Sequence, residues 1–90
     1  MNKQDLINEV YSRIEYITKR DITKVIDVVL EAIKQATREE EVRLINFGTF
    51  ESHVREARVG RNPITGERVD VPQKRAPVFH AAQAFKNAMQ

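Results

Sequence analysis

The sequence predicts an α+β protein in which two helices come first, antiparallel strands follow, and a short helix ends the chain. Three observations support this order. Apolar residues recur every three or four positions through residues 1–41, as in amphipathic helices. From residue 42 to residue 55 the pattern changes to the alternation typical of strands. Turn-forming pairs, Asn62-Pro63 and Thr65-Gly66, indicate a hairpin that reverses between residues 62 and 66.

The two N-terminal helices have recognisable start signals. Asn2 is placed to cap the first helix, with Asp5 three residues later as the second member of a capping box. Helical spacing of apolar residues then continues to about residue 14. Thr18 and Asp21 repeat the same signal at the start of the second helix, which we expect to end at the acidic run 39–41.

The second helix carries an apolar stripe too wide for one short partner helix to cover. We therefore expect it to pack both on its own chain and on a second copy. A chain of 90 residues buries little apolar surface by itself, and without cysteine it has no disulfide to stabilise it, so association is the remaining common solution. The stripe consists of Ile22, Val25, Ile26, Val29, Leu30 and Ile33.

The second half of the chain predicts a small sheet with a long hairpin. We expect strands at 42–45 and 49–55, joined by a turn at Asn46-Phe47-Gly48. Residues 68–71 return from the hairpin, and a short strand at about 77–79 leads into a helix from about residue 81 to residue 89. We find no repeat or linker, so residues 1–90 form one domain: a helical dimerisation half (1–41), a sheet with an arm at about 56–72 (42–80), and a terminal helix (81–90).

Charge is divided unequally between the two halves. Residues 1–41 hold seven Lys/Arg and nine Asp/Glu, a net charge of −2. Residues 42–90 hold eight Lys/Arg and four Asp/Glu, a net charge of +4. Between residues 55 and 75 six bases accompany three acids. This asymmetry favours a scaffold with an anion-binding appendage, and a solvated hairpin without any partner explains the charge equally well.

The hairpin has too few large apolar residues to bury a face of its own. Isolated two-stranded ribbons are marginally stable, so we expect this one to become ordered against a partner. A basic ribbon fits a DNA groove, and arginine side chains complement phosphates and narrow minor grooves. Pro63 at the tip has the shape of an apolar wedge for a base step, although an ordinary turn proline is the simpler interpretation.

Two segments resemble the family of HU and integration host factor. Residues 42–50 (VRLINFGTF) are similar to its strand–turn–strand motif, and residues 57–67 (ARVGRNPITGE) are similar to its DNA-binding arm. Both lie at the expected separation, and the similarity covers essentially the whole chain. The resemblance implies an intertwined homodimer with a helical base, a β-sheet saddle and two extended β-ribbon arms that reach around DNA through the minor groove.

The resemblance also assigns roles to individual residues. Pro63 would intercalate at a kink, and the dimer core would contain Phe47, Phe50 and Phe79, together with Val29 and Ile33 of the stripe. The turn at Asn46 would bring backbone N–H groups near phosphate. Arm, tip and terminal-helix matches, with the remaining bases of the basic segment, give these DNA-binding candidates: Asn46, Arg55, Arg58, Arg61, Asn62, Pro63, Arg68, Lys74, Arg75 and Lys86.

Several positions depart from the family pattern. Asn46 stands where the family usually has glycine, and asparagine tolerates positive φ better than most residues, so the turn can be kept. The segment His80-Ala81-Ala82-Gln83 replaces a basic residue followed by Pro-Gly-Lys. This replacement weakens the expected phosphate contacts at that end of the sheet, although not the fold.

We therefore predict an architectural, nucleoid-associated cytoplasmic protein that bends and compacts double-stranded DNA with little sequence specificity. Two alternatives stay open: a dimer of the same fold that acts mainly through protein–protein contacts, and a site-specific bender like integration host factor. We expect no enzyme activity, cofactor, small-molecule substrate or membrane partner. No metal site is expected either, because His53 and His80 are the only histidines and no cysteine accompanies them.

Overall fold

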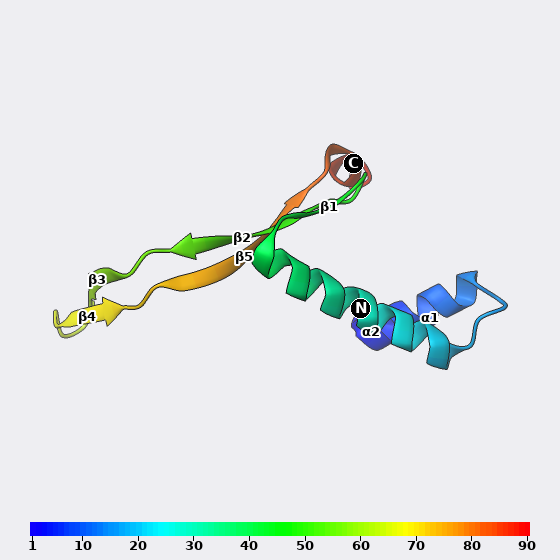
Figure 1. The fold of residues 1–90 in the computed structure, drawn as a ribbon, viewed down its shortest axis with the longest axis horizontal. Coiled ribbons are helices and arrows are strands. Elements are labelled where there is room, and N and C mark those ends of the chain that lie inside the picture. Colours follow the sequence, from blue (N-terminus) through cyan, green and yellow to red (C-terminus); the bar gives the residue numbers. More distant parts are fainter. The chain divides into compact units, whose positions relative to one another are not determined.

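The computed structural model describes residues 1–90 and has the α+β element order that the sequence predicts (Figure 1). It divides into two compact units, residues 1–35 and residues 36–90. None of its helices combines the length and hydrophobicity needed to cross a bilayer. The elements are α1 (Lys3–Arg13), α2 (Lys19–Glu39), β1 (Val42–Leu44), β2 (Gly48–Arg55), β3 (Arg58–Arg61), β4 (Arg68–Val71), β5 (Lys74–Ala81) and α3 (Gln83–Asn87).

Both predicted helix starts are confirmed. The Asn2 side chain accepts a hydrogen bond from the Asp5 amide at 2.9 Å, and the Asp5 carboxylate accepts one from the Asn2 amide at 3.1 Å, which completes the capping box. At the start of α2, Thr18 Oγ1 accepts from the Asp21 amide at 3.2 Å. These bonds satisfy amides that have no partner inside the helix.

In the second unit, β2 is the central strand of an antiparallel sheet ordered β1-β2-β5. β2 and β5 pair over their whole length, from Gly48 opposite Ala81 to Arg55 opposite Lys74. β3 and β4 form a separate two-stranded sheet, the arm, beyond the Arg55 end of this ladder (Figure 1).

The predicted boundaries of the last strand (about 77–79) and the last helix (about 81–89) are wrong, because these elements are Lys74–Ala81 and Gln83–Asn87. β5 begins at Lys74 rather than near residue 77, because its first three residues pair with the far end of β2. Pro77 lies inside it, which an edge strand tolerates because one side of such a strand needs no amide donor. The last helix begins at Gln83, two residues late, because Ala81 is still paired with Gly48 in the sheet.

The ladder between β2 and β5 has two different faces, because successive side chains of a strand point to opposite sides. One face carries Phe50 and Phe79, which are directly paired, with ring centroids 4.7 Å apart. The other is polar, and we call it the polar face of the ladder. It consists of Thr49, Glu51, His53 and Arg55 of β2 with Lys74, Ala76, Val78 and His80 of β5.

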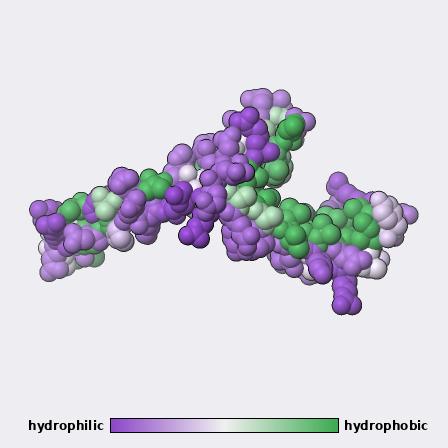
Figure 2. Space-filling model, viewed as in Figure 1, coloured by the Kyte–Doolittle hydropathy of each residue, from purple (hydrophilic) through white to green (hydrophobic).

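Very little apolar surface is buried within one chain. The only apolar side chains classed as buried are those of Ile7 and Ile22, at 2% and 3% exposure. Within the stripe of α2, Ile22 is buried, whereas Val25, Val29 and Leu30 are 48–59% exposed, and hydrophobic residues are visible along this helix in Figure 2. The helix therefore keeps three large apolar side chains of the stripe exposed.

The close approach at Gly48 gives a test of the sheet. A Cβ at this position would lie 2.5 Å from the Phe79 ring and 2.6 Å from the His80 carbonyl oxygen, so Gly48→Ala should lower the free energy of unfolding by about 1–3 kcal/mol through overpacking. The matched control is Gly60→Ala, where the nearest atoms are 3.9 Å away and the change should stay within about 0.5 kcal/mol. Urea unfolding measures both. Equal stability of the two variants would contradict the packing described here.

Candidate nucleic-acid interface

The tip of the arm is a turn organised by one asparagine. The Asn62 side-chain oxygen accepts hydrogen bonds from the amides of Ile64 at 2.9 Å and Thr65 at 3.4 Å. The Asn62 backbone pairs with Gly66 and Glu67, and Gly66 takes a positive φ of 73° that suits glycine. This turn holds Pro63 exposed at its outer edge.

Ile64, beside Pro63, is a residue of the tip that the sequence analysis did not single out. Its side chain is 91% exposed, the highest value among the large apolar residues of the chain. The sequence alone shows a large apolar residue directly after the proline of a predicted turn, and this pattern could have identified Ile64. The tip therefore presents two adjacent apolar side chains to solvent, supported by the Asn62 hydrogen bonds.

The arginines predicted for the arm lie on two different faces of it. Arg61 and Arg68 are directly paired across the ribbon and therefore share a face, whereas Arg58 is paired with Val71 on the other face. Arg61 donates a hydrogen bond to the Gly66 carbonyl at 3.1 Å, and Arg68 approaches Asp70 at 3.4 Å. Arg58 has no ion pair within the chain.

A second pair of cations stands where the arm joins the ladder. Arg55 and Lys74 are directly opposite each other on the polar face of the ladder, and neither has an ion pair within the chain. Arg75 is the exception among the candidates of this region, because it lies on the face of the phenylalanines and donates to Ser52 Oγ at 3.1 Å. The structure thus brings Arg55 and Lys74 together and separates Arg75 from them.

The remaining DNA-binding candidates lie at the opposite end of the ladder. Asn46 has a φ of 65°, so it adopts the positive φ expected of a residue in the glycine position. The Phe47 amide already donates to the Leu44 carbonyl at 3.0 Å, which removes one N–H that we expected to be available to phosphate. Lys86 is exposed on α3, which follows β5 at this same end.

The predicted core aromatics are together in one cluster of rings. Phe47 and Phe79 have centroids 5.6 Å apart, and Phe85 of α3, which the sequence analysis omitted, lies 5.1 Å from Phe47. Phe47 and Phe79 are 44% and 40% exposed, so the cluster is only half covered by its own chain. Packing α3 onto the sheet therefore depends on these rings.

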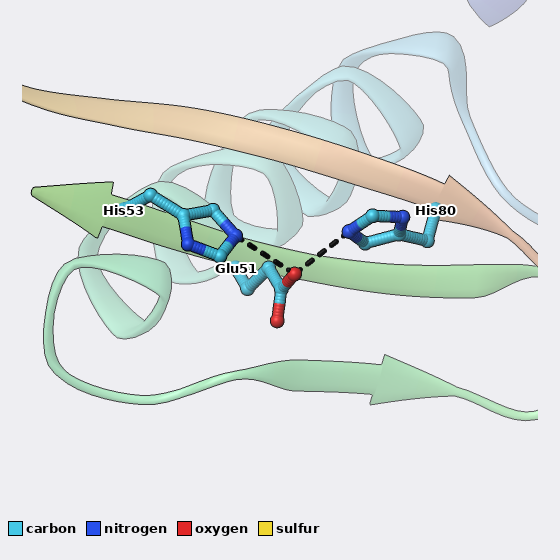
Figure 3. Close-up of side chains that lie close together, drawn as sticks. All are labelled: Glu51, His53 and His80. Atoms are coloured by element: carbon cyan, nitrogen blue, oxygen red, sulfur yellow. Dashed lines mark hydrogen bonds and ion pairs between the residues drawn. The ribbon is translucent and has the colours of Figure 1, made fainter. Parts of the chain in front are cut away.

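The polar face of the ladder also holds a cluster that the sequence analysis did not anticipate (Figure 3). Both imidazoles approach the same carboxylate oxygen: Glu51 Oε1 lies 3.0 Å from His53 Nε2 and 2.7 Å from His80 Nε2. Hydrogen bonds from His53 and then from His80 hold the pKa of Glu51 below its ordinary value. The sequence separation of 29 positions between Glu51 and His80 hides this cluster until the register is known.

Comparison with known proteins identifies the family. A sequence profile described as "Bacterial DNA-binding protein" matches residues 1–90. The chain is 43% identical to the DNA-binding protein HU of Geobacillus stearothermophilus and to that of Staphylococcus aureus (strain COL), over 99% of each chain.

Solved structures agree with this result. The chain resembles an HU–DNA cocrystal structure from Anabaena with a TM-score of 0.87 and 38% identity, over 99% of this chain and 97% of that one. It also resembles a point mutant of HU from Thermotoga maritima with a TM-score of 0.71 and 26% identity, over the full length of both chains. The similarity to HU confirms the resemblance stated from the sequence. The chain belongs to the bacterial DNA-binding protein family.

Proposed function

We propose that this protein is an architectural DNA-binding protein whose arm enters the minor groove and bends the duplex with little sequence specificity. The observation that carries the proposal is that cations occupy directly opposite positions twice along these paired strands: Arg55 opposite Lys74 in the ladder, and Arg61 opposite Arg68 in the arm. Like charges directly opposite each other destabilise a β-ribbon. Arg68 has Asp70 as a partner at 3.4 Å, and phosphate groups of DNA supply the anions that Arg55, Lys74 and Arg61 lack within the chain.

The relatives support DNA as the partner. The curated relatives are named DNA-binding proteins, and the Anabaena relative was crystallised with DNA. From Arg55 to Arg61 an extended ribbon covers about 20 Å at about 3.3 Å per residue, enough to follow several phosphates. Contacts dominated by phosphate, in a minor groove whose hydrogen-bonding pattern is degenerate, carry little base information.

The tip supplies the bending element. Pro63 and Ile64 are exposed apolar residues on a turn that Asn62 holds in shape. Insertion of an apolar wedge between base pairs, which partly unstacks them and kinks the duplex, is the general mechanism of minor-groove architectural proteins, HU and integration host factor among them. We assign this role to Pro63, with Ile64 beside it.

We also infer that the protein is an intertwined homodimer with two arms. One chain buries only Ile7 and Ile22 among its apolar side chains, while Val25 and Val28 of α2 are each 59% exposed. The half-covered ring cluster around Phe47 adds further apolar surface. A second copy that covers these surfaces provides the core that a single chain of this length lacks.

In this proposal the protein binds DNA and does not catalyse a reaction, and it is located in the nucleoid together with the DNA. The competing interpretation is a dimer that acts through protein contacts alone. It differs from our proposal in a measurable way, because only DNA binding requires release of counterions from phosphates.

DNA affinity should fall steeply with salt. If about six phosphates are neutralised, the slope of log K against log salt is roughly −5, and Arg55→Gln makes it shallower by just under one unit for each phosphate that the variant no longer neutralises. The control is Lys34→Gln, an equal change of charge on α2, where Lys34 pairs with Glu31 at 3.1 Å. Fluorescence anisotropy at several salt concentrations, on two unrelated duplexes, measures both slope and preference. A flat salt response supports the protein-contact role, and a strong preference for one duplex supports a site-specific bender.

Pro63→Ala should reduce the bend of bound DNA more than it reduces affinity, because proline adds no charge to the contact. Arg61→Ala, by contrast, should weaken binding to every duplex. Pro72→Ala, at an exposed proline outside the tip, is the matched control and should leave the bend unchanged. Energy transfer between the ends of a labelled duplex measures the bend. An unaltered bend in Pro63→Ala would make Pro63 an ordinary turn residue.

Thermal unfolding should depend on protein concentration, because folding and association are linked in an obligate dimer. A hundredfold dilution changes the association free energy by about 2.7 kcal/mol, which corresponds to a decrease in Tm of roughly 5–10 °C for a dimer of this size. Calorimetry and sedimentation measure the two quantities. A constant Tm together with a monomeric mass would refute the homodimer.

A further inference from the structure

The polar face of the ladder brings together three side chains that can ligate metals and that the arm does not use. Glu51 and His53 are two residues apart on β2, so they project from the same face. His80 is paired with Thr49 and stands diagonally opposite Glu51 on that face. Figure 3 shows both imidazole rings directed toward the carboxylate of Glu51.

The donor atoms are close to the spacing that a metal ion imposes. One donor atom from each residue can be chosen so that all lie within 4.8 Å of one another. Around a tetrahedral ion with bonds of about 2.0–2.1 Å, donor atoms are about 3.3 Å apart. The O–N distances of 2.7 and 3.0 Å would lengthen by about 0.6 and 0.3 Å to reach this spacing, and the two imidazole nitrogens, which lie within 4.8 Å of each other, would adjust to it as well. The side chains of His53 and His80 are more than half exposed, so they can rotate to make this adjustment.

We propose that Glu51, His53 and His80 form a binding site for a divalent transition-metal ion, with Zn²⁺ as its best-matched occupant. Two imidazole nitrogens and one carboxylate oxygen are a donor set that Zn²⁺ takes at sites with three protein ligands. Imidazole suits zinc, copper and nickel, whereas Mg²⁺ and Ca²⁺ prefer oxygen ligands throughout. Three protein ligands leave a fourth tetrahedral position, which faces solvent because the cluster lies at the surface.

The position of the site couples the metal to DNA, a step that rests on the proposed function. With neutral imidazoles the cluster carries the single negative charge of Glu51, and a bound dication changes this to a net charge of +1. Arg55 and Lys74 lie on the same face as Glu51. Without metal, the negative charge of Glu51 opposes their attraction for phosphate, and with metal bound the cluster adds to it. The open coordination position accepts a phosphate oxygen. By linkage, zinc and DNA then raise each other's affinity by the same factor.

The first experiment uses the full-length protein with ZnCl₂ and no DNA. Calorimetric titration should give one zinc per chain, and nitrogen NMR should show ring-nitrogen shifts of both histidines. Glu51→Gln, His53→Gln and His80→Gln should each weaken zinc binding by more than about tenfold. Loss of a residue that only hydrogen-bonds to a metal ligand already lowers metal affinity by about tenfold or more, and these three residues are the ligands themselves. The matched control, Glu56→Gln, removes an exposed carboxylate outside the cluster and should bind zinc like the original protein. MgCl₂ should not bind.

The second experiment measures DNA affinity of the same proteins with and without one equivalent of zinc. Zinc should tighten DNA binding by the original chain and by Glu56→Gln, and should have no effect on Glu51→Gln. Absence of zinc binding, or zinc binding by the three cluster variants equal to that of the original chain, overturns the metal site. Zinc binding without any change in DNA affinity overturns the coupling. If the protein binds no DNA at all, the proposed function fails, while the titration without DNA still decides the site.

Discussion

The antiparallel ladder between β2 and β5 is the interaction on which the functional surfaces of this protein depend. Eight directly opposed pairs, from Gly48 with Ala81 to Arg55 with Lys74, fix which side chains share a face. A shift of one residue would exchange the faces, placing phenylalanines where histidines now stand. The same ladder delivers the arm at one end and α3 at the other. Close contact at Gly48 with the Phe79 ring shows how tightly this register is packed.

The ribbon keeps its cations in an arrangement that is unfavourable without a partner. A ribbon selected for stability alone would place opposite charges across from each other, yet Arg61 stands opposite Arg68 and Arg55 opposite Lys74. Departures from local stability rules of this kind are expected at functional sites. The tip is different, because Asn62 satisfies the backbone of the turn and so holds Pro63 in place before any DNA arrives. The arm therefore combines a preformed tip with two arginines at directly opposite positions, of which only Arg68 has a carboxylate partner.

Several apolar residues of α2, unlike the cations of the ribbon, lack a partner of their own kind: apolar surface that would cover them. Helix starts are fixed locally by Asn2 and Thr18, but Val25, Val29 and Leu30 of the apolar stripe of α2 stay about half exposed. Burying apolar surface is the main favourable term in folding, and a chain of this length has little of it to bury alone. In the proposed homodimer, folding and association are therefore a single process. It would also explain how a chain with so small a core can carry an arm whose Val59 and Val69 side chains stay about half exposed.

The sequence by itself determined the elements that depend on near neighbours: the two capped helices, the turn at Asn46, the tip at Asn62 and the family to which the chain belongs. It determined neither the extent of β5 nor the start of α3, because both depend on pairing with a strand far away in the chain. Only the tertiary structure separated Arg75 from Lys74 and joined His80 to Glu51. The physical reason is common to all these cases. Hydrogen-bonded turns and caps here join residues two to five positions apart, whereas the face on which a strand residue lies is set by register.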